Sequence, residues 1–302
     1  MSRIYPSLFI CLAVFFLYGT PIHGGWEEII ENQCPTSSVC KITHEDKTYW
    51  VKRPESKKFA QSVVWRMRIL QWLIPLRMLK PQVFTSPTAL MNQEVSRLQT
   101  FHQAGISVPR LVYRAQNTLI LTDVGMNVEI LLRIDTSPDT RIRLLKKVVR
   151  AIKILHTKGL YHGRLLLKDV SYKNGRVSFL DLGEAFCGHM DIYEAQARDI
   201  LLFMYAALPF INNDHKILQE ILGYYGEYSD TVIEKLRTTR RYLIPVYWLI
   251  LPFARFLGND TRRALVATRT LGIVLATLSH RIPTTTTGSP QLFYPGTYAH
   301  KS

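Results

Sequence analysis

The chain has 302 residues, 47% of them hydrophobic, and its formal net charge is +15. This length suits one two-lobed domain or two small ones with a sizeable core, and the charge favours an anionic partner such as a membrane, a phosphorylated glycolipid or nucleic acid. The four cysteines (Cys11, Cys34, Cys40 and Cys187) are too few and too scattered for a disulfide framework and lack zinc spacing. Cys34 and Cys40 could pair, but reduced thiols are the simpler interpretation.

The N-terminal segment is strongly apolar. Residues 4–18 contain no polar side chain except Ser7 and stand behind a single Arg3. The stretch is short for a membrane-spanning helix and resembles the apolar region of a signal peptide, although no typical cleavage site follows it. Residues 1–25 are therefore a membrane anchor, a cleaved signal or a start assigned too early.

Three segments of the first half predict a small α+β unit. Residues 48–53 form a β-rich run that follows a turn-like sequence at residues 45–47 and ends near Lys52. Residues 92–101 show the spacing of an amphipathic helix, which carries Glu94. Residues 119–125 predict a strand that leads into a connecting segment. Lys52 and Glu94 could equally be ordinary surface charges.

Residues 63–80 have an unusual composition. Trp65, Trp72 and six aliphatic residues alternate with Arg66, Arg68, Arg77 and Lys80. Basic and aromatic residues interleaved in this way indicate a helix that lies in a lipid interface, although Pro75 would kink it. A helix packed on the core is the alternative.

The middle of the chain predicts a helix followed by a hairpin. Residues 141–158 have apolar positions at helical spacing, and Gly159 stops the helix. Residues 170–180 predict two short strands that turn at Asn174-Gly175. Because a hairpin brings its ends together, Asp169 and Asp181 should be neighbours. Such a pair suits Mg²⁺ that carries nucleotide phosphates. Two solvated acids flanking a hairpin are the alternative.

Two segments remain in the last third. Residues 242–257 are apolar and aromatic, with Arg240 and Arg241 before them. Pro245 and Pro252 disfavour a regular membrane span, so we expect this stretch to pack on the core of the C-terminal lobe. Residues 283–302 predict a disordered tail.

The motifs around the hairpin resemble the protein-kinase-like superfamily, whose catalytic loop reads H-x-D-x-x-x-x-N and whose metal motif reads D-F-G. His162 matches the loop histidine, and Asp169 falls at the asparagine position. Asp181-Leu182-Gly183 matches the metal motif, with Leu for Phe. Arg164 departs from the pattern at the catalytic aspartate. The resemblance is closest to bacterial lipopolysaccharide-core (Kdo/heptose) kinases and small atypical kinases; it covers about residues 39–280.

This resemblance implies an α+β, two-lobed protein-kinase-like fold with a small β-rich N-lobe and a larger helical C-lobe. Lys52 would hold the ATP phosphates and pair with Glu94, while Asp123 belongs to the hinge-like segment that would cradle adenine. Asp199 resembles the helix aspartate that braces the catalytic loop. The phosphate-binding glycine loop is missing; residues 34–38 are a weak substitute.

Composition and resemblance together predict four regions: an apolar N-terminal segment (1–25), an N-lobe (26–125) with a basic amphipathic insertion (63–80), a helical C-lobe (126–282) and a disordered tail (283–302). The function that the resemblance implies is ATP-dependent phosphotransfer with Mg²⁺ on Asp169 and Asp181. We expect this at the cytoplasmic face of the inner membrane, with an anionic membrane or phosphorylated glycolipid as partner and a protein substrate as the other option. Asp169 could replace the missing base, or Arg164 could neutralise phosphate charge.

The competing hypothesis is a pseudokinase, a nucleotide-binding or inert regulatory scaffold, because Arg164 replaces the usual catalytic aspartate. Nucleic-acid binding is not expected. The sequence contains no zinc finger, helix-turn-helix fingerprint or RNA-binding aromatic signature.

Overall fold

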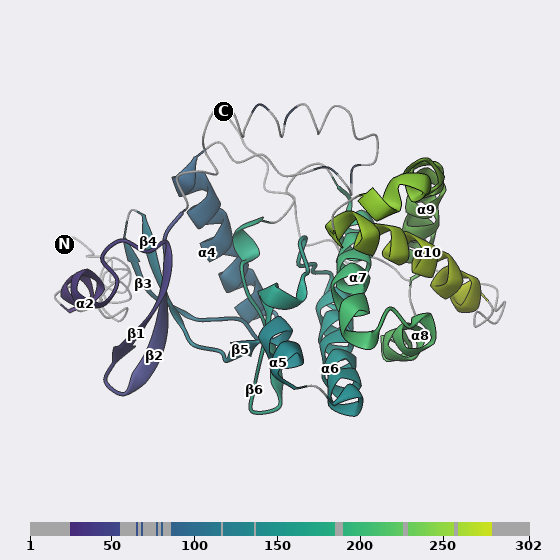
Figure 1. The fold of residues 1–302 in the computed structure, drawn as a ribbon. Helices are drawn as coiled ribbons and strands as arrows, with labels where there is room; N and C mark the ends of the chain where they lie inside the picture. The colour runs from purple at the N-terminus through teal and green to yellow at the C-terminus, as the bar shows by residue number, and fades with distance from the viewer. Residues whose placement is uncertain are drawn as a thin grey trace, which may run out of the picture.

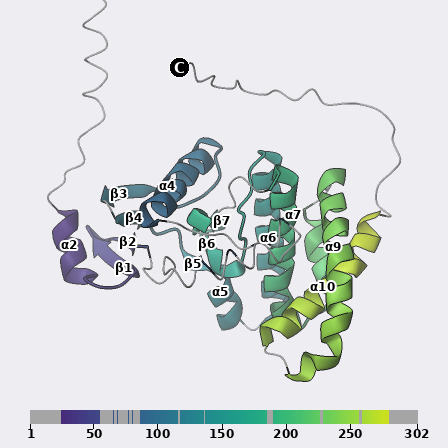
Figure 2. The same cartoon turned by 90° about the horizontal axis from the view of Figure 1, so that it is seen from above.

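The protein is described by a computed structural model, which covers residues 25–54, 86–115, 117–135, 137–184, 190–225, 229–256 and 259–279 together with Trp65, Arg68, Arg77 and Lys80. The predicted N-terminal apolar segment, most of the basic insertion at 63–80 and the tail lie outside these residues. Figures 1 and 2 show a small sheet-containing lobe beside a larger helical lobe. The predicted two-lobed α+β architecture, with a small β-rich N-lobe and a larger helical C-lobe, is confirmed.

The N-lobe is a four-stranded antiparallel sheet between two helices, with strand order β1-β2-β4-β3. Its elements are α2 (Trp26–Gln33), β1 (Val39–His44), β2 (Lys47–Lys52), α4 (Pro87–Gln103), β3 (Leu111–Ala115) and β4 (Thr118–Thr122). Side chains of a strand alternate between the two faces. Ile120 accordingly packs in the small cluster beneath α2, whereas Leu119 and Leu121 join the main core that includes α4.

The turn from α2 into β1 lies at the end of the sheet that carries Lys52. Val39 pairs with Lys52 across β1 and β2, and the Arg53 amide donates to the Ser38 carbonyl over 2.7 Å. Cys34 and Cys40, on either side of this turn, form a disulfide with their Cα atoms 6.2 Å apart. Our expectation of reduced thiols was wrong, because the short connection from helix to strand brings the two side chains within bonding reach.

A short second sheet of order β5-β6-β7 joins the lobes. Its strands are β5 (Met126–Asn127), β6 (Val170–Lys173) and β7 (Arg176–Phe179). The turn between β6 and β7 has positive φ at Asn174 and Gly175, as the sequence predicts for a tight hairpin. The hairpin is therefore confirmed, and it places the ends of η4 (Leu167–Asp169) and the segment before η5 (Leu182–Glu184) side by side.

The C-lobe is helical and packs around a single apolar core. Its helices are α5 (Val128–Ile134), α6 (Pro138–Thr157), α7 (Ile192–Ala207), η6 (Leu208–Ile211), α8 (His215–Gly223), α9 (Asp230–Ile250), η7 (Leu251–Phe256) and α10 (Asn259–Ser279). α6 contains most of the predicted helix 141–158, and Gly159 follows it with φ of +69°. Among the described residues, no helix is long and apolar enough to cross a bilayer.

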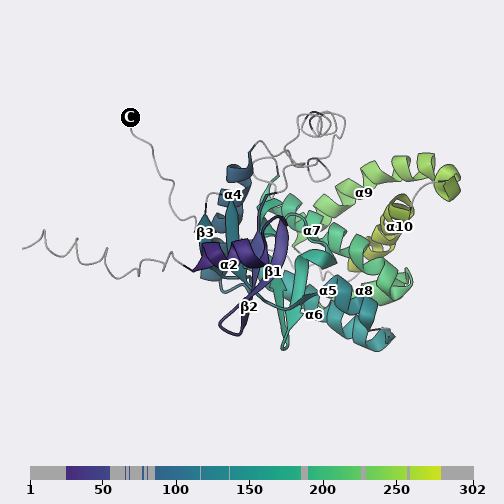
Figure 3. The same cartoon turned by 60° about the vertical axis from the view of Figure 1, so that its left-hand side comes forward.

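The prediction that residues 242–257 pack on the core was wrong for the part that the structure describes. The buried side chains of α9 all lie in its first half, at Val232, Ile233, Leu236 and Thr239. Beyond them no side chain of the helix is buried, and Tyr242, Val246, Trp248 and Leu249 are exposed. In Figure 3 this end of α9 forms the far edge of the helical lobe.

Candidate functional site

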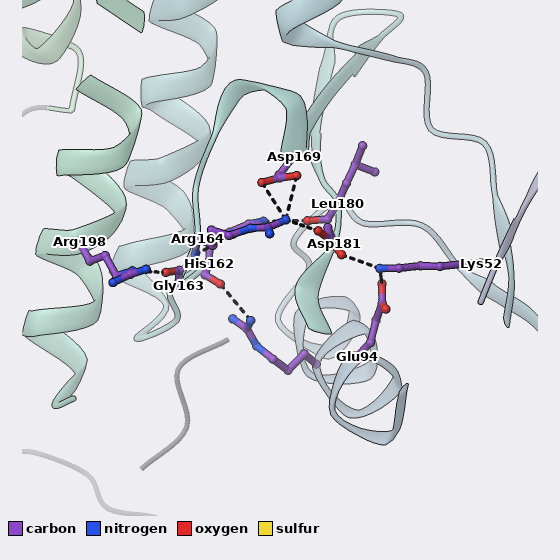
Figure 4. A network of polar contacts seen from close by, with 10 residues as sticks. Lys52, Glu94, His162, Gly163, Arg164, Asp169, Leu180, Asp181 and Arg198 are labelled. Carbon is purple, nitrogen blue, oxygen red and sulfur yellow. Dashed lines mark hydrogen bonds and ion pairs between the residues drawn. The ribbon is translucent and has the colours of Figure 1, made fainter. Parts of the chain in front are cut away.

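The site is centred on the ammonium group of Lys52, at the end of β2. Its Nζ lies 2.7 Å from Oε1 of Glu94, on α4, and 2.6 Å from Oδ1 of Asp181, which follows β7. Figure 4 shows the three side chains converging from separate elements. Lys52 and Glu94 therefore form the predicted ion pair between strand and helix, and Asp181 extends it into a three-member cluster.

Burial and charge act in opposite directions on Lys52. Desolvation lowers the pKa of its ammonium group, but the carboxylates of Glu94 and Asp181 outweigh desolvation and raise the pKa above its ordinary value. The ammonium is thus held charged at neutral pH. A fixed cation in this position is suited to a phosphate ligand.

Arg164 occupies the centre of the second half of the site. Its guanidinium forms an ion pair with Asp181 and lies 3.4 Å from Oδ2 of Asp169. The hairpin brings the two carboxylates together as predicted, and the arginine at the position of the missing catalytic aspartate lies between them (Figure 4). One nitrogen, Nη2, makes both contacts, so the carboxylates converge on one point.

Asp169 and Asp181 are the candidate ligands for Mg²⁺. Two carboxylates are the number of protein ligands that Mg²⁺ commonly takes beside nucleotide phosphates and water, so Asp169 and Asp181 fit the ion in type. The point on which they converge, however, holds the Arg164 guanidinium. An ion bound by both carboxylates must therefore displace this group. No cluster of three or more His, Cys, Asp or Glu ligands occurs in the described part of the chain.

His162 positions the loop that carries Arg164. Its Nε2 lies 2.8 Å from the Leu180 carbonyl, so the imidazole donates there, and its Nδ1 faces the Arg164 amide. Desolvation lowers the pKa of His162 to about 4, with the nearby Arg97 acting in the same direction. A neutral histidine thus connects the loop that carries Arg164 to Leu180, the residue before Asp181.

Asp199, on α7, binds the backbone of the loop that carries Arg164, as the resemblance implies. Its fully buried carboxylate accepts from the backbone amides of His162 and Gly163 over 2.6 and 2.7 Å. His156 lies 3.2 Å from the same carboxylate. Gly163, directly before Arg164, has φ of +92°. This conformation favours glycine, which explains why a glycine occupies the position.

Two arginines hold the loop in ways that the sequence analysis missed. Arg97 donates to the carbonyls of His162 and Leu182, each over 3.0 Å, and also to that of Tyr161. Arg198 donates to the Gly163 carbonyl over 2.7 Å, and desolvation lowers the pKa of its guanidinium to about 10. The spacing of Arg97, three residues after Glu94 on α4, was the available signal, since residues i and i+3 share a helix face.

Asp123 lies in a different polar network. Its carboxylate accepts from Trp50 over 2.9 Å and pairs with Lys173 over 2.8 Å. Burial raises the pKa of Asp123, but Lys173 and Trp50 outweigh it and hold the pKa below its ordinary value. The Asp123 side chain therefore joins β2 to the hairpin. The other predicted site residues come together in the structure: Lys52, Glu94, His162, Arg164, Asp169 and Asp181.

Comparison with known proteins gives distant similarities. No protein-family profile matches the chain. An uncharacterized protein of Haemophilus influenzae is 24% identical over 224 residues, which cover 74% of this chain and 84% of that protein. The EKC/KEOPS complex subunit BUD32 of Encephalitozoon cuniculi is 27% identical over 150 residues, which cover 49% of this chain and 73% of that protein.

Among solved structures, the ADP-bound aminoglycoside phosphotransferase APH(2'')-Ib matches with a TM-score of 0.42 and 12% identity, over 82% of this chain and 98% of that one. The streptomycin-ATP complex of APH(2'')-IIa matches with a TM-score of 0.33 and 10% identity, over 74% and 93% of the two chains. At this distance the side chains of the site itself carry the functional argument.

Proposed function

We propose that the protein binds ATP and transfers its terminal phosphoryl group to a hydroxyl group. The observation that carries this proposal is the Lys52 ammonium held between Glu94 and Asp181. Phosphoryl transfer depends mainly on positioning and on stabilising charge. Lys52 would hold the nucleotide phosphates, and Glu94 would fix the direction of Lys52.

The remaining residues fix the geometry of the acceptor side. Neutral His162 and buried Asp199 hold the catalytic loop, so that Arg164 stays beside Asp169 and Asp181. An arginine remains protonated and cannot act as a general base, but its fork of donors suits phosphate oxygens. Asp169 would then have one of two roles: it would accept the proton of the acceptor hydroxyl, or it would hold Mg²⁺ together with Asp181. Mg²⁺, when bound by Asp169 and Asp181, would supply charge neutralisation at the phosphates.

We infer a phosphorylated glycolipid at the membrane surface as the acceptor, as in lipopolysaccharide-core sugar kinases. The net charge of +15 supports an anionic partner, and so does the basic composition of residues 63–80. A protein acceptor is the alternative. The proposed location is the cytoplasmic face of the inner membrane.

Nucleotide binding tests the proposal first. We expect ATP with Mg²⁺ to bind in titration calorimetry, and Lys52→Ala and Asp181→Ala to weaken binding at least about tenfold, equivalent to about 1.4 kcal/mol. Lys146→Ala is the matched control, because Lys146 also forms an ion pair, with Glu220, but lies on α6 away from the cleft. Unchanged affinity in both site variants would refute the phosphate-binding role of Lys52.

The second candidate function is a pseudokinase, which the position of Arg164 between the two carboxylates favours. Transfer of labelled phosphate to lipopolysaccharide-core glycolipids or to a generic protein acceptor separates the two functions. Turnover that Lys52→Ala abolishes supports the phosphotransferase. Tight ATP binding without transfer to either class of acceptor supports the pseudokinase.

A further inference from the structure

The C-terminal half of α9 and the start of η7 expose a continuous set of apolar and aromatic side chains. Leu249, Trp248 and Phe253 are 72%, 64% and 58% exposed. Further exposed members are Tyr242, Val246 and Leu251. We call these six residues the α9 patch. A helix that is apolar on nearly every side is normally covered by protein or lipid.

The sequence directly beside the α9 patch is basic, and no acidic residue occurs between Glu234 and Asp260. Lys235 pairs with Asp191 and Glu194, and Arg237 pairs with Glu234. The basic edge of the patch is therefore made by Arg240 and Arg241, directly before Tyr242. Arg241 is exposed. A basic edge beside exposed Trp, Tyr and Phe is the combination that lets a helix lie in the surface of an anionic bilayer.

We propose that the α9 patch inserts into the surface of a membrane that contains anionic lipid, with α9 lying along the interface. Tryptophan and tyrosine prefer the headgroup region, and the aliphatic residues and Phe253 would enter the acyl boundary. The proposal rests on the membrane placement in the proposed function, but it assigns the contact to α9 and η7. It adds a site to residues 63–80, which were expected to bind lipid.

A second copy of the chain is a poorer occupant. In a two-fold symmetric dimer both patches meet in one interface, which would also gather the flanking arginines of both copies. With a net charge of +15 on each copy, this arrangement adds repulsion. Anionic lipid instead complements the basic edge.

Vesicle co-sedimentation of the full chain tests the proposal. Vesicles of phosphatidylcholine with and without phosphatidylglycerol are compared for the wild type and for Leu249→Glu/Phe253→Glu. The matched control is Ile134→Glu/Ile154→Glu, which places the same charges at apolar positions that are 67% and 53% exposed on α5 and α6. We expect the patch variant to bind the anionic vesicles at least tenfold more weakly, and the control to bind like the wild type.

A site-resolved measurement guards against binding through other segments or a folding defect. Brominated lipid should quench the fluorescence of the wild type, and Trp248→Phe should lose part of this quenching while still sedimenting with vesicles. Equal vesicle binding by both double variants, or quenching unchanged in Trp248→Phe, would overturn the proposal. Loss of self-association in the patch variant, without any vesicle binding by the wild type, would instead assign the patch to a dimer. ATP affinity measured on the same samples reports the proposed function separately.

Discussion

Arg164 limits what Asp169 and Asp181 can bind. Its guanidinium pairs with Asp181 and approaches Asp169, so it supplies positive charge where a metal ion would otherwise bridge them. Arginine keeps its proton at every pH of interest. The site therefore carries a permanent cation that competes with a divalent ion.

Removing this cation should strengthen metal binding. We expect Arg164→Ala to bind Mn²⁺, used as a spectroscopic probe for Mg²⁺, about tenfold more tightly than the wild type, because about 1.4 kcal/mol of charge competition is lost. Electron paramagnetic resonance titration of the nucleotide-free protein measures this. Arg176→Ala, at an exposed position on β7, is the control. Identical Mn²⁺ affinity in wild type and Arg164→Ala would show that the guanidinium leaves the carboxylates at no cost.

His162 should make the fold sensitive to acid. Its pKa of about 4 in the folded protein lies below the ordinary value of 6.5, so the unfolded chain binds more protons between these pH values. Stability is therefore complete above pH 6.5 and falls as the pH drops toward 4, by up to about 3 kcal/mol. His162→Phe should flatten this slope by up to one proton, or about 1.4 kcal/mol per pH unit.

Urea unfolding at a series of pH values measures the slope. His102→Phe, at an exposed position on α4, is the control and should keep it. A wild-type slope retained in His162→Phe would assign the acid sensitivity to other groups.

The sequence predicted part of this site. The contacts of Lys52 with Glu94 and the approach of Asp169 to Asp181 follow from the order of motifs and from the hairpin turn. The positions of the Arg164 and Arg97 side chains depend on which buried carbonyls and carboxylates surround them in the folded chain, and no local pattern specifies that. The contacts of Asp123 with Trp50 and Lys173 could not be predicted either, because they join residues that are far apart in the sequence.

At the scale of single elements, turn chemistry was the reliable signal. Asn174-Gly175 and Gly159 mark a hairpin and a helix end because few residues tolerate positive φ. The apolar composition of residues 242–257 led to the wrong prediction that they pack on the core. Composition alone does not distinguish a helix that its own chain buries from one whose apolar side chains are exposed. Spacing also failed for Cys34 and Cys40, whose pairing depends on the turn between helix and strand.

The connection between the lobes passes through Gly125, which should tolerate no side chain. Its φ is +106°, and an added Cβ would lie 2.6 Å from the Tyr172 carbonyl oxygen. Gly125→Ala should therefore lower the free energy of unfolding by more than about 2 kcal/mol. Gly105→Ala is the control, since Gly105 also has positive φ but nothing within 4 Å; it should cost about 1 kcal/mol. Urea unfolding compares them, and equal losses would contradict the predicted clash.

At the scale of the whole molecule, the sequence predicted the two-lobed arrangement but not the position of the exposed apolar surface. The excess of basic residues predicted an anionic partner, but composition cannot say on which face basic and apolar side chains meet. That depends on where α9 leaves the helical lobe (Figure 3). The two-lobed arrangement was predictable, because the strand-rich and helix-rich halves of the chain follow one another in sequence.

Helix α4 makes contacts on both sides of the site. Glu94 binds Lys52 of the sheet, while Arg97, three residues later, donates to the carbonyls of Tyr161 and His162, just before Arg164, and of Leu182 in η5. A shift of this one helix would loosen both. Arg97→Met should therefore reduce ATP affinity severalfold through a coupling free energy of about 1 kcal/mol, measured by calorimetry. Arg114→Met is the control, because Arg114, on β3, also donates to a residue of α4, Asn92.

Equal ATP affinity in Arg97→Met and the control would show that the two contacts are independent. If they are coupled, the relation is reciprocal: a ligand that orders the loop must tighten nucleotide binding by the same factor. Binding of an acceptor and binding of ATP would then each increase the affinity for the other through α4, without direct contact between the two ligands.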